Sequence, residues 1–207
     1  MRVEPKITTT ENRNTFIQKI GNLNPHNLFL YMSVFGSASI FAFLLIAFNL
    51  SFSADSRIEF PDAFLFSTGL LIIANLSISR TISYYLSENM HKMVIFLGIT
   101  LMMGISFLLS QFVAWEQLYV QGVRISGIAF ESYLYLLSGL HVLHLLGAMI
   151  YLGLLFFTYI RASIDPVKTL VMTTNPYQMV RLKMLVTCWN FLDIAWIIIF
   201  INFFFLL

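Results

Sequence analysis

The sequence is poor in charged residues and almost without cysteine. Charged side chains make up 11% of the 207 residues, and Cys188 is the single cysteine. About a quarter of the residues of an ordinary soluble domain are charged, so this composition argues against a soluble enzyme. One cysteine cannot form a disulfide within the chain, and we interpret Cys188 as a small core residue.

The motifs of common enzyme and transporter classes are also missing. There is no nucleophile elbow, phosphate-binding loop or carboxylate pair, so no pattern predicts catalysis. The absence of repeats and of inverted-topology halves argues against a secondary transporter. The first 27 residues are polar and contain neither a short apolar core nor a small-residue cleavage site, which excludes a secretory signal peptide. We expect residues 1–27 to form a polar cytoplasmic segment.

Long apolar runs fill the rest of the chain. Hydrophobic residues make up 58% of the sequence, and the mean hydropathy is +0.81. Runs of about 20 apolar residues predict membrane-spanning helices, whereas a β-barrel would show short segments of alternating polarity. We therefore predict an all-α integral membrane protein in which residues 28–207 form one five-helix domain. The predicted spans are 28–50, 61–79, 93–118, 132–160 and 183–207.

The basic residues are distributed unequally between the two sides of these spans. Ten of them fall on the side of the N-terminus, and only Arg57 and Arg124 fall on the other. Basic loops stay in the cytoplasm, so we predict a cytoplasmic N-terminus and an external C-terminus. The ten are Arg2, Lys6, Arg13, Lys19, Arg80, Lys92, Arg161, Lys168, Arg181 and Lys183.

Two parts of the cytoplasmic side have a predicted role at the membrane surface. Hydrophobic residues recur at helical spacing within residues 15–23, so this segment is either an amphipathic surface helix or a disordered tail. Arg161, Arg181 and Lys183 are candidates for contact with anionic lipid head groups. The alternative is that these basic residues only set the topology.

Polar residues in the last two spans predict a buried polar seam. His141 and His144 are three residues apart and share one helix face. At 1.5 Å per residue, Asp193 reaches about the depth of His141, and Asn190 about that of His144. We expect Asp193 to accept a hydrogen bond from His141. His144 would meet Asn190, Thr187 or a backbone carbonyl.

Ligation of haem or of a metal ion is the alternative role of the histidines. Two histidines on one helix face cannot bind haem from both sides, and His26 and His91 are predicted too far away in depth. Zinc needs at least three ligands, and Asp193 is the only further candidate. We therefore predict no metal site and no cofactor in this chain.

Small and polar residues in the second and third spans indicate close helix packing. Gly104 and Gln111 are seven residues apart and share a face of the third span. We interpret both as packing residues, because small side chains allow helices to approach closely. The same interpretation applies to the second span, whose small and polar residues are Ser67, Thr68, Gly69 and Asn75.

Three motifs, in order along the chain, resemble subunit III of the haem-copper respiratory oxidases such as cytochrome c oxidase. Residues 111–116, Gln-Phe-Val-Ala-Trp-Glu, are similar to the family's Gln-x-x-acid-aromatic end of a helix. Residues 138–144, Ser-Gly-Leu-His-Val-Leu-His, are similar to small-Gly-x-His-x-x-His. Residues 189–196, Trp-Asn-Phe-Leu-Asp-Ile-Ala-Trp, are similar to Trp-His-Phe-x-Asp-x-x-Trp. The resemblance covers residues 60–205 and fits the family's five-helix form.

The resemblance implies a non-catalytic subunit of a terminal oxidase in a bacterial cytoplasmic membrane. Haem and copper would lie in partner subunits, with this chain packed against catalytic subunit I, in one complex with subunit II. The implied roles are to stabilise subunit I, to bind phospholipid and to support proton uptake. The donor would be cytochrome c or quinol, a larger respiratory supercomplex is a further partner, and nucleic acid is not expected.

The chain departs from the family pattern at three places. Residues 28–50 contain no carboxylate, although the family often has a glutamate there. Asn190 stands where the last motif has histidine, and Ala114 stands where the first has an acid. These departures favour a role in assembly and lipid binding over a direct role in proton transfer. The alternatives are a subunit III-like component of a nitric oxide reductase, a small electron-transfer protein and a proton-coupled transporter.

Overall fold

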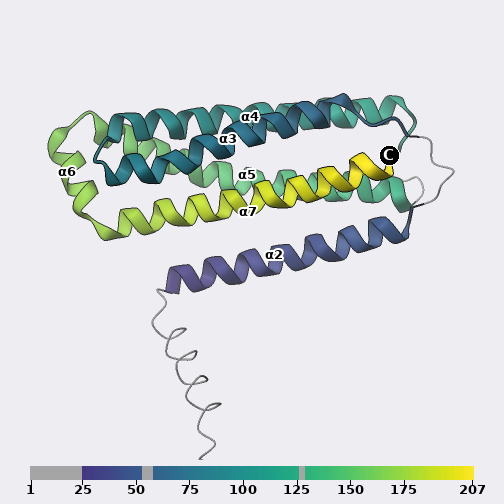
Figure 1. Cartoon of the computed structure of the whole chain (residues 1–207), viewed down its shortest axis with the longest axis horizontal. Helices are drawn as coiled ribbons and strands as arrows, with labels where there is room; N and C mark the ends of the chain where they lie inside the picture. Colours follow the sequence, from purple (N-terminus) through teal and green to yellow (C-terminus); the bar gives the residue numbers. More distant parts are fainter. Residues whose placement is uncertain (1–24, 53–57, 126–128) are drawn as a thin grey trace, which may run out of the picture.

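The protein is a bundle of long helices. The structure, a computed structural model, describes residues 25–52, 58–125 and 129–207. Within these ranges the helices are α2 (Pro25–Leu50), α3 (Asp62–Leu86), α4 (Met90–Val120), α5 (Ala129–Ser163), α6 (Pro166–Thr174) and α7 (Pro176–Leu206). All except α6 are long and apolar enough to cross a membrane (Figure 1). The predicted all-α membrane fold with five spanning helices is thereby confirmed.

The connection between the last two spanning helices differs from the prediction. The predicted spans leave residues 161–182 as a connection, but α5 extends to Ser163, α6 fills the middle and α7 already begins at Pro176. Two Asx-Pro pairs explain this difference. Asp165 and Asn175 each accept a hydrogen bond from the backbone N–H two residues on, at 3.0 Å, and a proline follows each. An Asx N-cap followed by proline starts a helix.

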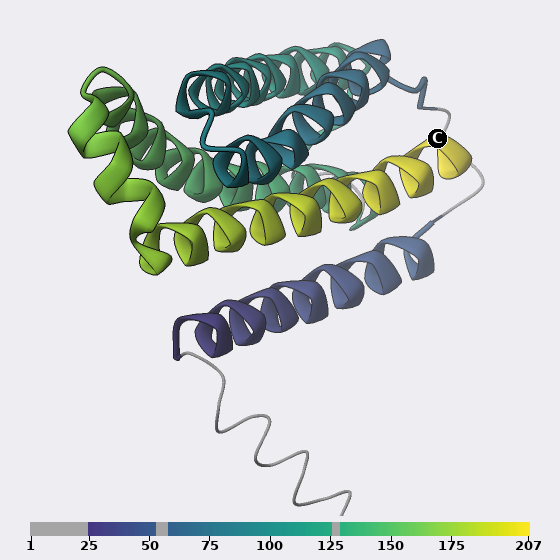
Figure 2. The same ribbon diagram turned by 60° about the vertical axis from the view of Figure 1, so that its left-hand side comes forward.

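Successive spanning helices along the chain run in opposite directions, so α2 and α7, which are in contact, run the same way. Helices α3 and α4 form a close antiparallel hairpin, and α7 packs against both α3 and α5 (Figures 1 and 2). Helix α6 lies across the end of the bundle where α5 ends and α7 begins. The indoles of Trp189 and Trp196 are fully buried in the centre. Large side chains at the helix contacts therefore fill the core, as close packing requires.

Helix α2 lies at the edge of the bundle, against α5 and α7. Among the side chains of α2 that the structure describes, only Phe41 and Phe48 are buried. The Phe48 ring stacks on Phe130 at 4.7 Å and meets Phe203 edge-on at 5.3 Å. Near the same end, Asn49 donates a hydrogen bond to Asn202. A few anchors, and not a continuous buried face, thus hold α2 in place.

Six of the seven basic residues that the structure describes gather at the end of the bundle that carries α6. Arg80, Lys92, Arg161, Lys168, Arg181 and Lys183 lie there because each stands near the corresponding end of its helix. Arg124 follows α4 at the opposite end. The predicted amphipathic segment, residues 15–23, lies outside the described residues.

Candidate functional site

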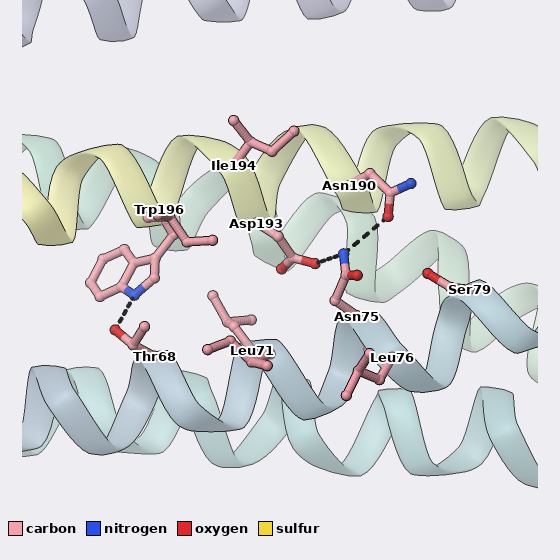
Figure 3. A pocket seen from close by; sticks show the side chains of 11 residues that line it. Thr68, Leu71, Asn75, Leu76, Ser79, Asn190, Asp193, Ile194 and Trp196 are labelled. Atoms are coloured by element: carbon pink, nitrogen blue, oxygen red, sulfur yellow. Dashed lines mark hydrogen bonds between the residues drawn. The ribbon is translucent and has the colours of Figure 1, made fainter.

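The main cluster of polar side chains in the membrane core joins α3 to α7. The Asn75 side-chain nitrogen donates to Asp193 Oδ2 at 2.6 Å and to Asn190 Oδ1 at 3.0 Å (Figure 3). Asp193 is buried, whereas Asn75 and Asn190 are half-buried. Asn75 lies next to the midpoint of α3, and Asn190 lies next to that of α7. The amide of Asn75 thus bridges two residues on the facing helix at the middle of the bundle.

A second hydrogen bond joins the same two helices nearer the outer end predicted for the bundle. The Trp196 indole N–H donates to Thr68 Oγ1 at 3.0 Å, and the Thr68 hydroxyl donates to the Phe64 carbonyl oxygen at 2.8 Å. Polar side chains in a membrane interior are commonly satisfied across helices in this way. We call Thr68, Asn75, Asn190, Asp193 and Trp196 the α3–α7 polar cluster.

A groove of about 420 Å³ runs beside this cluster between the two helices. Its floor contains the buried side chains of Thr68, Leu71, Asp193 and Trp196. Its rim is exposed and mostly aliphatic, formed by Ile72, Leu76, Ser79, Ile194 and Ile197. We call this feature the α3–α7 groove. A polar floor inside an apolar rim suits a ligand or a protein segment that is mostly apolar but carries a hydrogen-bonding group.

The expected hydrogen bond between His141 and Asp193 is wrong. His141 is fully buried, and neither ring nitrogen has a hydrogen-bond partner among the described residues. Its ring instead lies among aromatic rings, at centroid distances of 5.0 Å from Trp196, 5.7 Å from Phe107 and 6.3 Å from Phe41. We call these three rings the ring cage. Asp193 points toward α3, so equal depth did not bring the two groups together.

His144 lies in a different environment one turn along α5. Its Nδ1 is 2.8 Å from the Leu140 carbonyl oxygen, and its Nε2 is 3.2 Å from Ser37 Oγ on α2. A carbonyl can only accept, so Nδ1 carries the proton and Nε2 accepts from the Ser37 hydroxyl. The expectation of a backbone carbonyl partner is met, whereas Asn190 instead bonds Asn75.

The predicted packing residues Gly104 and Gln111 are both buried where α4 contacts its neighbouring helices. A Cβ at Gly104 would collide with the Met149 sulfur and come within 3.2 Å of the Trp189 ring. Gln111 is fully buried, and its amide has no hydrogen-bond partner among the described residues. One turn further along α4, the Trp115 indole N–H donates to Ser138 Oγ at 3.0 Å. Shape, more than hydrogen bonding, therefore governs the contact of α4 with α5 and α7.

Neither the histidines nor the carboxylates form a ligand set. In the described ranges, no three His, Cys, Asp or Glu side chains lie close enough together to hold a metal ion. The two core histidines both lie beside Phe41 but have no common polar neighbour, and Asp193 is bonded to an amide. The arrangement can therefore hold helices together and present polar atoms to the groove.

Sequence reasoning missed the two residues of α3 that complete the cluster. Asn75 and Thr68 were both assigned to general helix packing. The signal that identifies Asn75 is its depth, because it stands at the middle of its span and Asp193 is at the same level. Thr68 carries no comparable signal, because its hydroxyl donates to a carbonyl oxygen of its own helix and therefore needs no partner on another helix.

Comparison with known proteins points to one kind of subunit. No family model matches the chain. A cytochrome c oxidase subunit 3 of a Bacillus species is 24% identical over 209 aligned residues, which cover 97% of this chain and 95% of that protein. Probable cytochrome c oxidase subunits 3 of Mycobacterium leprae and Nocardia farcinica are 33% and 32% identical over 102 and 107 residues. These matches span about half the length of the latter two relatives, at 46% and 48%. The resemblance predicted from the three motifs is confirmed.

Proposed function

We propose that this chain, a homologue of cytochrome c oxidase subunit 3, is the non-catalytic subunit III of a haem-copper terminal oxidase. The observation that carries the proposal is the alignment with the Bacillus subunit over almost the whole of both chains. The five apolar helices agree with it. Haem and copper would lie in the partner subunits, where oxygen is reduced with electrons from cytochrome c or quinol.

The role of the chain in that complex is to stabilise catalytic subunit I and to support proton uptake during turnover. The surroundings of its carboxylates favour an indirect role for this chain in proton uptake. Asp193 accepts from Asn75 and is bounded by apolar and amide groups. No carboxylate occurs in residues 28–50, and Asn190 does not titrate. A subunit of this kind acts by shaping the surroundings of subunit I, because it has few groups that could carry a proton.

The chain belongs in a bacterial cytoplasmic membrane with the α6 end of the bundle facing the cytoplasm. The asymmetry of the basic residues supports this orientation. It places residues 1–27 in the cytoplasm, residues 28–207 in the membrane domain and the C-terminus outside.

Phospholipid binding at the cytoplasmic end is the third part of the proposal. A crevice of about 390 Å³ lies between α2, α3 and α7, with Tyr31, Ile82 and Lys183 among its lining residues. An ammonium group above an apolar crevice suits an anionic head group with its acyl chain below. Arg161 and Arg181 lie at the same end of the bundle and would contact neighbouring head groups.

Mild-detergent purification of the tagged chain from its own membranes tests the function. We expect haem-containing oxidase subunits to co-purify, with an oxidase optical spectrum and oxygen consumption in the eluate. Co-purification with nitric oxide reductase subunits would assign the chain to the other enzyme. Purification of the chain alone, with or without a haem spectrum of its own, would contradict the proposal.

A further inference from the structure

The α3–α7 groove presents polar atoms at the level of the middle of the bilayer's hydrocarbon core. Asn75 and Asn190 stand next to the midpoints of their helices, and both line the groove. A bilayer has a hydrocarbon core of about 30 Å, and a helix rises 1.5 Å per residue. The two amides therefore lie far from either polar surface. Water cannot easily satisfy them there.

Three polar atoms of the cluster have no hydrogen-bond partner among the described residues. The single contact between the amides uses the Asn75 nitrogen and the Asn190 oxygen. Among the described residues, no hydrogen bond uses the Asn190 nitrogen or the Asn75 oxygen. Figure 3 shows the Asn190 nitrogen turned away from Asn75. In addition, Asp193 Oδ1 is buried without a hydrogen-bond partner among the described residues, and the residue as a whole is only 5% exposed.

The groove opens sideways from the bundle and is long enough for a helix to lie against it. The rim residues Ile72, Leu76 and Ile194 are 50%, 64% and 58% exposed. Thr68 and Ser79, at its two ends, are about 16 Å apart along α3 at the usual helical rise. The aliphatic rim extends over about three helical turns around a polar floor, and this length and polarity match one face of a transmembrane helix.

We infer that the α3–α7 groove is the docking site for a transmembrane helix of another oxidase subunit, one that carries a hydrogen-bonding side chain at the bilayer midplane. This inference rests on the proposed function. An acyl chain would fill the apolar rim but would leave the amide groups of Asn75 and Asn190 unpaired in hydrocarbon, which is unfavourable. A serine, threonine, asparagine or histidine on a facing helix would pair with them. Side chains of this kind commonly join transmembrane helices.

Site-specific photo-crosslinking in native membranes tests the inference. Benzoylphenylalanine replaces Ile194 or Ile72 on the groove rim and, as controls, Leu154 on α5 or Met102 on α4, which are exposed to a similar degree. We expect the groove positions to crosslink to a transmembrane segment of another oxidase subunit, and mass spectrometry would locate a polar residue near the adduct. Lipid or quinone adducts at the groove, adducts to a second copy of this chain, or adducts at the control positions alone would overturn the inference.

A substitution pair gives a second readout that does not depend on a bulky probe. Asn190→Leu removes the free amide and one hydrogen bond from Asn75, whereas Asn202→Leu on the same helix removes the bond from Asn49. We expect Asn190→Leu to lower retention of the chain in the purified complex about three- to ten-fold, and Asn202→Leu to lower it less. Equal retention would overturn the inference. A wild-type chain that brings down no oxidase subunit would instead contradict the proposed function.

Discussion

The α3–α7 polar cluster and the ring cage around His141 are neighbours that share Trp196, yet they bury polar groups in different ways. In the cluster, side-chain hydrogen bonds cross from one helix to the next. In the cage, the imidazole of His141 has aromatic neighbours and no hydrogen-bond partner among the described residues. One region is therefore held by directional bonds, and the other by the fit of its rings.

This difference shows that a polar residue in a membrane core does not identify its own partner. A neutral imidazole can pack against rings as an aromatic group, although its unpaired nitrogens make burial costly. An amide or carboxylate has no ring that packs in this way, although the amide of Gln111 is also buried without a hydrogen-bond partner among the described residues. Substitutions that separate bonding from shape should therefore affect the two regions differently.

The largest loss of stability is expected for Asn75→Leu. The substitution removes the donor of two hydrogen bonds and leaves the Asp193 carboxyl without its amide partner. Interhelical hydrogen bonds in membranes contribute about 0.6–1.7 kcal/mol each, so we expect a loss of about 1–3 kcal/mol in the free energy of unfolding. Tryptophan fluorescence during SDS titration measures it. Asn49→Leu, at the edge of the bundle, is the control, and equal losses in both variants would contradict the central role of Asn75.

A smaller loss is expected for Gly104→Ala, which tests the fit of the core beside the ring cage. The added Cβ collides with the Met149 sulfur and crowds Trp189. Overpacking of a core costs about 1–3 kcal/mol, and we expect the lower half of that range because methionine is flexible. Thermal unfolding in detergent measures the effect. Gly147→Ala is the matched control, since nothing lies within 4 Å of its added Cβ. A loss of stability in the control alone would show that shape does not govern this contact.

A loss of about 1 kcal/mol is expected for Thr68→Val, which removes one bond at nearly constant volume. The Trp196 N–H then lacks its acceptor, while the indole keeps its place against His141 and Phe107. Thr100→Val is the control, because the Thr100 hydroxyl bonds only the Phe96 carbonyl of its own helix. The same SDS titration compares the two variants. A control as unstable as Thr68→Val would mean that the bond between the helices adds nothing.

Residue spacing determines the height of each polar group along its own helix, but it does not predict how the helices are rotated. Residue spacing along a helix axis converts directly into height, and height is the quantity from which the contact of Asp193 with His141 was expected. The direction in which Asp193 points depends on how α7 packs against α2, α3 and α5. That is a property of the whole bundle, so His141 was matched to Asp193 on height alone.

The helix boundaries teach a similar lesson about local signals. The span predictions followed hydropathy and so ended where polar residues begin, although α4, α5 and α7 are each longer than a hydrocarbon core of about 30 Å requires. Asp165-Pro166 and Asn175-Pro176 are start signals that are legible in the sequence. Capping chemistry therefore could have predicted α6, which hydropathy alone could not.

The smallest effect is expected for His141→Phe, and its comparison with His144→Phe tests the contrast between bonding and shape on a single helix. Phenylalanine at position 141 keeps an aromatic ring in the cage and removes two unpaired nitrogens, so we expect a change below about 1 kcal/mol of either sign. Phenylalanine at position 144 removes the bonds to Leu140 and Ser37, and we expect a loss of about 1–2 kcal/mol. Ser37→Ala should reproduce part of that loss, because it removes the bond to α2 alone. SDS titration of the three variants measures the differences. If His141→Phe is the least stable of them, the imidazole of His141 has a polar partner in the membrane, and the ring cage is then a binding site and not a packing site.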